Sequence, residues 1–118
     1  GVFPSRAEGW NLELLEMMSC GKSVIATDYS AHTEFCNKDN CGLIPINETE
    51  LAYDGKWFSG QGSWAKIDET AKKSIADEMR KVHELKKAGS LKVNSKGVQR
   101  ASELSWDNTS EKILGALQ

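Results

Sequence analysis

The sequence contains no long apolar run. Among its 118 residues, no stretch approaches the roughly 18 apolar residues that a membrane-spanning helix needs. The N-terminus shows no signal-peptide pattern, and the chain opens with Gly1-Val2-Phe3 rather than an initiator methionine. We therefore expect a soluble, globular domain that is a piece of a longer protein.

Cysteine and histidine, the usual ligands of zinc, are also scarce. Cys20, Cys36 and Cys41 form no Cys-x-x-Cys pair, and His32 lies far from His83. This spacing argues against a zinc site. It favours free thiols in a reducing cytoplasm, with a Cys36–Cys41 disulfide across the short loop as the alternative.

Positive charge is scarce in the first half of the chain. In residues 1–54 acidic side chains outnumber basic ones by nine to three, which argues against a nucleic-acid site there. Residues 65–100 are basic, but their lysines fall largely on the polar side of a predicted helix. A solvated helix face explains them better than a phosphate-rich partner does.

The first half alternates short apolar runs with helical patterns. We predict strands over residues 2–4, 24–27 and 42–46, and helices over residues 11–20 and 31–35, the second capped by Ser30. Two consecutive βαβ crossovers of this kind give a parallel sheet. The expected fold class is therefore α/β, a partial Rossmann-like sheet of about three strands with flanking helices.

The second half breaks this alternation. Residues 47–66 contain Asp54-Gly55 and further glycines, which predicts a long ordered loop with a short hairpin around that dipeptide. Helices are expected over residues 68–88 and 91–104 and after Ser105. In the last helix we expect an apolar side formed by Trp106, Ile113, Leu114 and Leu117.

The first strand–helix junction carries the strongest chemical pattern. Ligands of parallel α/β sheets bind at the carboxyl edge, where this junction lies. Gly9 allows close backbone approach, and the amides of Trp10, Asn11 and Leu12 are the unsatisfied donors of the helix start, which suits a phosphate. Glu8 and Glu16 flank these amides, and carboxylates accept hydrogen bonds from pairs of sugar hydroxyls.

The same spacing has an ordinary structural explanation. Glutamates are common in a first helical turn because they complement the helix dipole. Neither GxxxxGK[ST] nor GxGxxG occurs in the chain. Spacing alone leaves the two interpretations level.

A family resemblance favours the functional interpretation. The run from Glu8 to Glu16, followed by Met18 to Lys22 and Val24 to Asp28, resembles the signature of family 4 (group 1) glycosyltransferases, an E-x7-E motif within "PSxxEGfGlxxLEAMAxGxPVIaT". The segment "YSAHTE" corresponds to the family's "GGxxE", and "ASELSWDNTSEKILGAL" is similar to its closing helix. The likeness covers residues 2–46 and 101–117.

The resemblance implies a GT-B enzyme that transfers a sugar from a nucleoside diphosphate donor with retention and without a metal or other cofactor. By position, Glu16 would bind the ribose hydroxyls and the amides of Gly9, Trp10, Asn11 and Leu12 would face the sugar and diphosphate. Glu8, the candidate catalytic residue, would contact the donor sugar in a positioning and electrostatic role rather than as a nucleophile.

The sequence departs from the family at three positions. Asn11 stands where glycine is frequent, but asparagine tolerates unusual dihedrals. Ser23 replaces a common proline. Ala31-His32 replaces a pair of small residues, and His32 is better explained as a surface or packing residue than as an acid–base group.

The resemblance also implies that the chain, residues 1–118, is a fragment of a C-terminal nucleotide-sugar-binding domain. The acceptor domain and the family's basic diphosphate-binding segment are absent; Arg6 is expected to form an ordinary salt bridge rather than replace them. The fragment alone is expected to be inactive and to form a homodimer, because an open parallel-sheet edge pairs unless covered. The acceptor is unknown, and any membrane association is expected only through the parent protein.

Two further hypotheses remain open. The enzymatic alternative is that the chain is part of another GT-B protein, such as a nucleotide-sugar 2-epimerase or a glycogen-synthase-like enzyme. From a different class, it could be a non-catalytic α/β interaction or nucleotide-binding module, whose amphipathic helices bind a partner protein.

Overall fold

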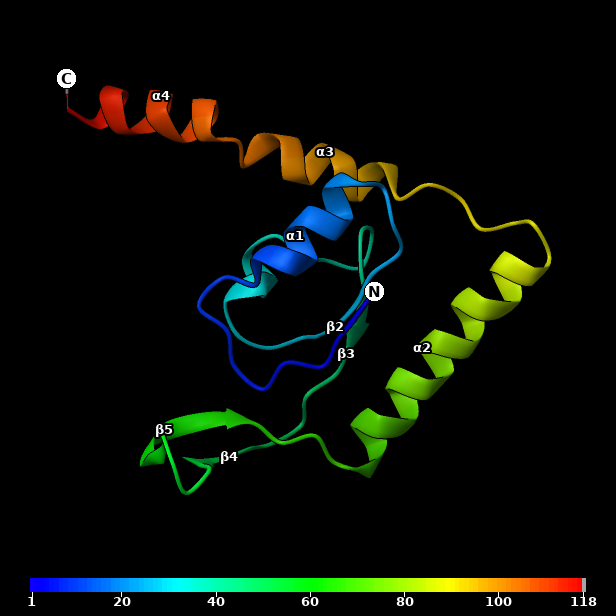
Figure 1. Cartoon of the computed structure of the whole chain (residues 1–118), viewed down its shortest axis with the longest axis vertical. Coiled ribbons are helices and arrows are strands. Elements are labelled where there is room, and N and C mark those ends of the chain that lie inside the picture. The colour runs from blue at the N-terminus through cyan, green and yellow to red at the C-terminus, as the bar shows by residue number, and fades with distance from the viewer. Residues whose placement is uncertain (118) are drawn as a thin grey trace.

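The predicted parallel sheet is present. In the computed structural model, which describes residues 1–117, three strands lie side by side in the order β1-β2-β3. They are β1 (Val2–Phe3), β2 (Ile25–Thr27) and β3 (Gly42–Ile44), and both pairings are parallel. Helix α1 (Leu12–Ser19) connects β1 to β2, and the short 3-10 helix η1 (Ala31–Glu34) connects β2 to β3 (Figure 1). The α/β class and the three-strand sheet are confirmed.

The sheet is buried on both faces. Successive side chains of residues 24–26, in and just before β2, alternate between two cores. Val24 and Ala26 face α1, in a cluster completed by Leu14, Met18, Phe35, Cys36 and Cys41. Ile25 faces the opposite way, towards Ile44 and the α2 residue Ala71. The continuous apolar run around β2 is therefore that of a central parallel strand, as predicted.

A β-hairpin and three helices follow the sheet. The hairpin pairs β4 (Thr49–Tyr53) with β5 (Ser59–Ala65) and turns at Asp54-Gly55, as the sequence predicted. Helix α2 (Glu69–Lys87) begins at its cap Asp68 and packs on β2 and β3. Helix α3 (Ser95–Glu103) packs on α1, and α4 (Trp106–Ala116) follows it.

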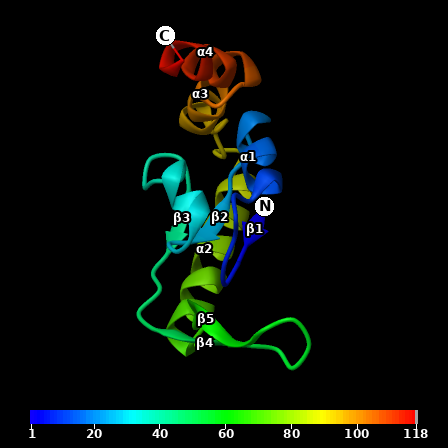
Figure 2. The ribbon, with the colours of Figure 1, turned by 90° about the vertical axis from the view of Figure 1, so that its left-hand side faces the viewer.

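The molecule is more extended than a compact domain of its length. Its radius of gyration is 16.4 Å, against about 13.5 Å expected for 118 residues. The hairpin and α4 account for this, since they lie at opposite ends of the molecule (Figures 1 and 2). Most of the apolar side expected in α4 is exposed, including Trp106 at 87%.

Two details of the predicted elements were wrong. Helix α3 starts at Ser95 rather than residue 91, because the Asn94 side chain caps it by accepting from Gly97 N. Ser30 does not cap η1: its side chain makes no capping hydrogen bond there and instead binds the backbone of Glu8.

Candidate functional site

The loop after β1 is fixed to the start of η1 by Ser30. The Ser30 hydroxyl accepts a hydrogen bond from Glu8 N at 2.7 Å and donates one to Glu8 O at 2.8 Å. Both polar groups of the Glu8 backbone are thus bound to one side chain, although the two residues are 22 positions apart. This arrangement holds Glu8 at the carboxyl edge of the sheet.

Ser30 adopts a backbone conformation that residues other than glycine rarely use. Its φ is 77° and its ψ is −167°, a region that costs about 1–3 kcal/mol for a residue with a side chain. Strain of this kind persists only where surrounding contacts enforce it, and it clusters at functional sites. Here the two hydrogen bonds to Glu8 enforce it.

The Glu8 carboxylate is only partly engaged. Its side chain is half-buried, and Oε1 accepts a hydrogen bond from the Ser5 hydroxyl at 2.7 Å. Within residues 1–117, Oε2 accepts no hydrogen bond and forms no ion pair. One oxygen of a carboxylate that is held in place therefore remains available to an incoming hydroxyl.

Asn11 connects this loop to α1. It is buried and adopts the left-handed conformation, with φ 73° and ψ 67°, which asparagine tolerates better than most residues. Its Oδ1 caps the helix by accepting from Leu14 N at 3.4 Å. Its Nδ2 lies 3.5 Å from Ser5 Oγ, the hydroxyl that also binds Glu8.

The backbone amides that lead into the first residue of α1 have no hydrogen-bond partner in the described chain. In the described chain, the N–H groups of Gly9, Trp10, Asn11 and Leu12 donate no hydrogen bond. They precede the positive end of the α1 dipole. These donors can therefore bind an anion, and water in its absence.

Glu16 is exposed on α1, one turn beyond Leu12 on the same side of the helix. Its carboxylate has no hydrogen bond or ion pair within residues 1–117. The two glutamates do not bind each other. Glu8 is held within the loop, whereas Glu16 is free on the helix.

The side chains of Trp10 and Leu12 lie elsewhere. With Leu15, Leu104 and Trp106 they line an apolar groove of about 400 Å³ between the start of α1 and the start of α4. Trp10 also packs on Phe35, with ring centroids 5.1 Å apart. For these two residues, only the backbone amides are available to a ligand at the loop.

His32 is a packing residue. It is fully buried, and its Nε2 lies 2.6 Å from the carbonyl oxygen of Thr27, so Nε2 carries the proton. Nδ1 has no partner in the part of the chain that the structure describes. Because the ring is enclosed, it is not positioned for acid–base chemistry at the loop.

The hairpin contacts the loop through Arg6. The sequence predicted a salt bridge for Arg6 but did not indicate that its partner lies in the hairpin. The Arg6 guanidinium lies 4.0 Å from the ring centroid of Trp64 and pairs with Glu50. Its Nε donates to Ala65 O at 3.1 Å, and Ala65 N donates to Arg6 O at 2.8 Å. Arg6 is thus in a salt bridge, as predicted, and joins the hairpin to the Glu8 loop. These partners lie 44 to 59 residues away, so no local pattern indicates them.

Residues 1–117 contain no group of three or more histidine, cysteine or acidic side chains arranged to hold a metal ion. None of the described helices combines the length and the apolar character required to cross a membrane.

The fold and the loop define an α/β protein with a candidate ligand site at the carboxyl edge of a parallel sheet. Residues 1–54, just under half of the chain, match the family model described as "Glycosyl transferases group 1". The matched part contains the sheet, α1, η1 and every candidate site residue. Searches of curated proteins and of solved structures found no match to the chain.

Proposed function

We propose that this chain is the donor-binding part of a retaining glycosyltransferase, which transfers a sugar from a nucleoside diphosphate sugar to an acceptor. The observation that carries the proposal is the combination of the family match over residues 1–54 with a loop whose unpaired amides lie between Glu8 and Glu16. The remainder of a catalytic site would belong to an acceptor domain outside this chain.

The amides of Gly9, Trp10, Asn11 and Leu12 would bind the diphosphate and the donor sugar. Their N–H groups have no partner within residues 1–117, and the helix dipole adds about half a positive charge at this end. Asn11 supports this role because its left-handed backbone and side-chain cap fix the turn before the helix. A preformed turn binds without a further cost of ordering.

The two glutamates would bind different hydroxyl groups of the same donor. Glu16 is free on α1 and would accept from the two ribose hydroxyls. Glu8 has one free carboxylate oxygen on a loop fixed by Ser30, and would bind the sugar. In this position its negative charge would also stabilise positive charge that develops at the anomeric carbon.

Assembly and location complete the proposal. The chain would form a homodimer, since no strand of the described chain pairs with the outer edges of β1 and β3 and exposed sheet edges tend to pair. A cytoplasmic location would suit the three free cysteines.

One observation favours an interaction module as the second candidate. Helix α4 exposes Trp106, Ile113 and Leu114, by 87%, 58% and 62% respectively. Apolar side chains gathered on one element mark surfaces that bind other proteins. Under that alternative the chain would bind a partner through α4 and no nucleotide sugar at the loop.

Amide shifts distinguish the two candidates. We would titrate UDP-, GDP- and ADP-sugars at millimolar concentration and follow the amide resonances of residues 9–12. The proposal predicts saturable shifts with at least one donor, weakened in Glu16→Ala but retained in Glu13→Ala, a matched control that removes an exposed glutamate of the same helix. The absence of shifts with all three donors would favour the interaction module.

A further inference from the structure

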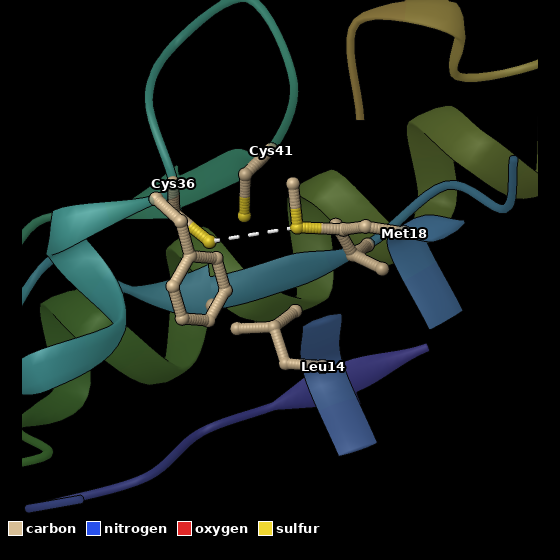
Figure 3. Packing of buried hydrophobic residues seen from close by; sticks show 7 residues of the cluster. Leu14, Met18, Cys36 and Cys41 are labelled. Atoms are coloured by element: carbon tan, nitrogen blue, oxygen red, sulfur yellow. Dashed lines mark hydrogen bonds between the residues drawn. The ribbon is translucent and has the colours of Figure 1, made fainter. Parts of the chain in front are cut away.

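Three sulfur atoms meet in the core beneath the loop. Cys36 and Cys41 come from the two ends of the segment that joins η1 to β3, and Met18 comes from α1. Their sulfur atoms point towards one another (Figure 3), and Cys36 Sγ lies 3.9 Å from Met18 Sδ. Both cysteines are free thiols, with 5% and 8% of their surface exposed.

The two thiols differ in reactivity and access. A hydrogen bond between them is the main cause that raises the pKa of Cys36, aided by burial. The same hydrogen bond is the main cause that lowers the pKa of Cys41; burial opposes this shift, and the Ala26 backbone adds a smaller lowering contribution. The thiolate is therefore favoured on Cys41, and thiolates are the reactive form of cysteine.

Cys41 also has a route to solvent. It lines a surface cavity of about 260 Å³ between β3, α2 and the segment before α3, together with charged residues of both signs, namely Lys38, Lys81, Lys92, Asp39 and Glu78. Cys36 does not line this cavity. Of the two cysteines, Cys41 is therefore the one that borders solvent-accessible space.

We propose that Cys41 and Cys36 form a redox-active pair, in which peroxide oxidises Cys41 and Cys36 then closes an intramolecular disulfide. In the first step the Cys41 thiolate attacks one oxygen of hydrogen peroxide and becomes a sulfenic acid, while the other oxygen leaves as hydroxide and takes up a proton. In the second step Cys36 attacks the Cys41 sulfur, the S–S bond forms, and the sulfenic oxygen leaves as water with the thiol proton. Peroxide is reduced to two waters, and the two thiols are oxidised.

The closed disulfide would stiffen the segment that supports the candidate site. The Asn40 carbonyl, next to Cys41, accepts from the Asn94 side chain at 2.8 Å. Cys36 N donates to His32 O at 2.9 Å, within η1, whose preceding residue Ser30 holds Glu8. This inference does not depend on the proposed function, because the chemistry needs only the two thiols and the oxidant.

The test starts from the folded Cys20→Ser chain, which removes the exposed third thiol. After treatment with equimolar hydrogen peroxide, we expect the chain to lose the mass of two hydrogen atoms. It should leave no thiol for maleimide after unfolding and regain both thiols with a reductant. Two thiols that persist, or oxygen atoms added without a disulfide, would overturn the proposal.

Two double variants test the order of the steps. In Cys20→Ser/Cys36→Ser the sulfenic acid on Cys41 has no resolving thiol and should be captured by dimedone. In Cys20→Ser/Cys41→Ser, the remaining Cys36 should stay unmodified under the same treatment. Capture at Cys36 and not at Cys41 would overturn the assignment. If either double variant fails to fold, the mass of the Cys20→Ser chain decides alone.

Discussion

Replacing Ser30 tests how the structure holds Glu8. Ser30→Ala removes both hydrogen bonds to the Glu8 backbone and keeps a side chain at φ 77° and ψ −167°. Ser30→Gly removes the same hydrogen bonds and relieves the backbone strain. The pair therefore separates the hydrogen bonds from the backbone conformation at a single position.

The magnitudes follow from the two contributions. Each hydrogen bond contributes about 0.5–1.5 kcal/mol net, so Ser30→Ala should lower the free energy of unfolding by about 2 kcal/mol. In Ser30→Gly, relief of about 2 kcal/mol of strain offsets that loss. Glycine's extra freedom in the unfolded chain costs about 0.7 kcal/mol, so Ser30→Gly should be destabilised by about that amount.

The assay is urea unfolding followed by tryptophan fluorescence, with hydrogen exchange of the Glu8 amide measured on the same proteins. Exchange at Glu8 should accelerate in both variants because both lose the hydroxyl. Equal stability of the alanine and glycine variants would refute the strain argument. A Glu8 amide that stays protected in both would refute the hydrogen-bond argument.

Three further predictions concern the loop and the hairpin. Asn11→Gly should lower the free energy of unfolding by a few tenths of a kcal/mol. Asn11→Ala should lower it by about 2 kcal/mol, because the helix cap is lost and alanine is held in the left-handed conformation. Equal losses for the two variants in urea unfolding would contradict this prediction. Arg6→Lys should lower it by about 1 kcal/mol, because lysine loses the planar contact with Trp64; an unchanged Trp64 amide shift would count against it. Backbone N–H groups, first that of Phe58, lower the pKa of the Asp54 carboxyl below 3.8. Its stabilisation is therefore present above that value and is lost as pH falls through the lower folded pKa. The protection of the hairpin amides, measured relative to the exchange rate of unfolded peptide at the same pH, should therefore fall in more acid solution.

The sheet could be predicted because its evidence is local. A β-branched run at residues 24–27 and a glycine after α1 are sufficient to place a buried strand after a helix. The Asp54-Gly55 turn likewise indicated the hairpin from two residues. The left-handed conformation of Asn11 was not itself predicted, but it agrees with the expectation that asparagine tolerates unusual dihedrals better than most residues.

The contacts that fix the site could not be predicted. Ser30 is predicted to be a helix cap because it precedes a short helical pattern. In the structure its hydroxyl instead binds the backbone of Glu8, 22 residues earlier. The contacts of Arg6 with Trp64 and Ala65 are equally remote in sequence. Helix α4 is amphipathic in sequence, but no described element covers its apolar residues, because periodicity indicates a buried face without identifying what buries it.

The central claim is that Glu8 and Glu16 bind different parts of one donor, and calorimetric titration of single variants tests it directly. We would measure the affinity of Glu8→Gln, Glu16→Ala and the Glu13→Ala control for a nucleoside diphosphate, with and without its sugar. Loss of a hydrogen bond to a charged group costs about 1.5–3 kcal/mol, a weakening of about 10- to 100-fold. Glu16→Ala should show it with both ligands, and Glu8→Gln only when the sugar is present. Wild-type affinity in both variants, or equal weakening of both ligands by Glu8→Gln, would contradict the account.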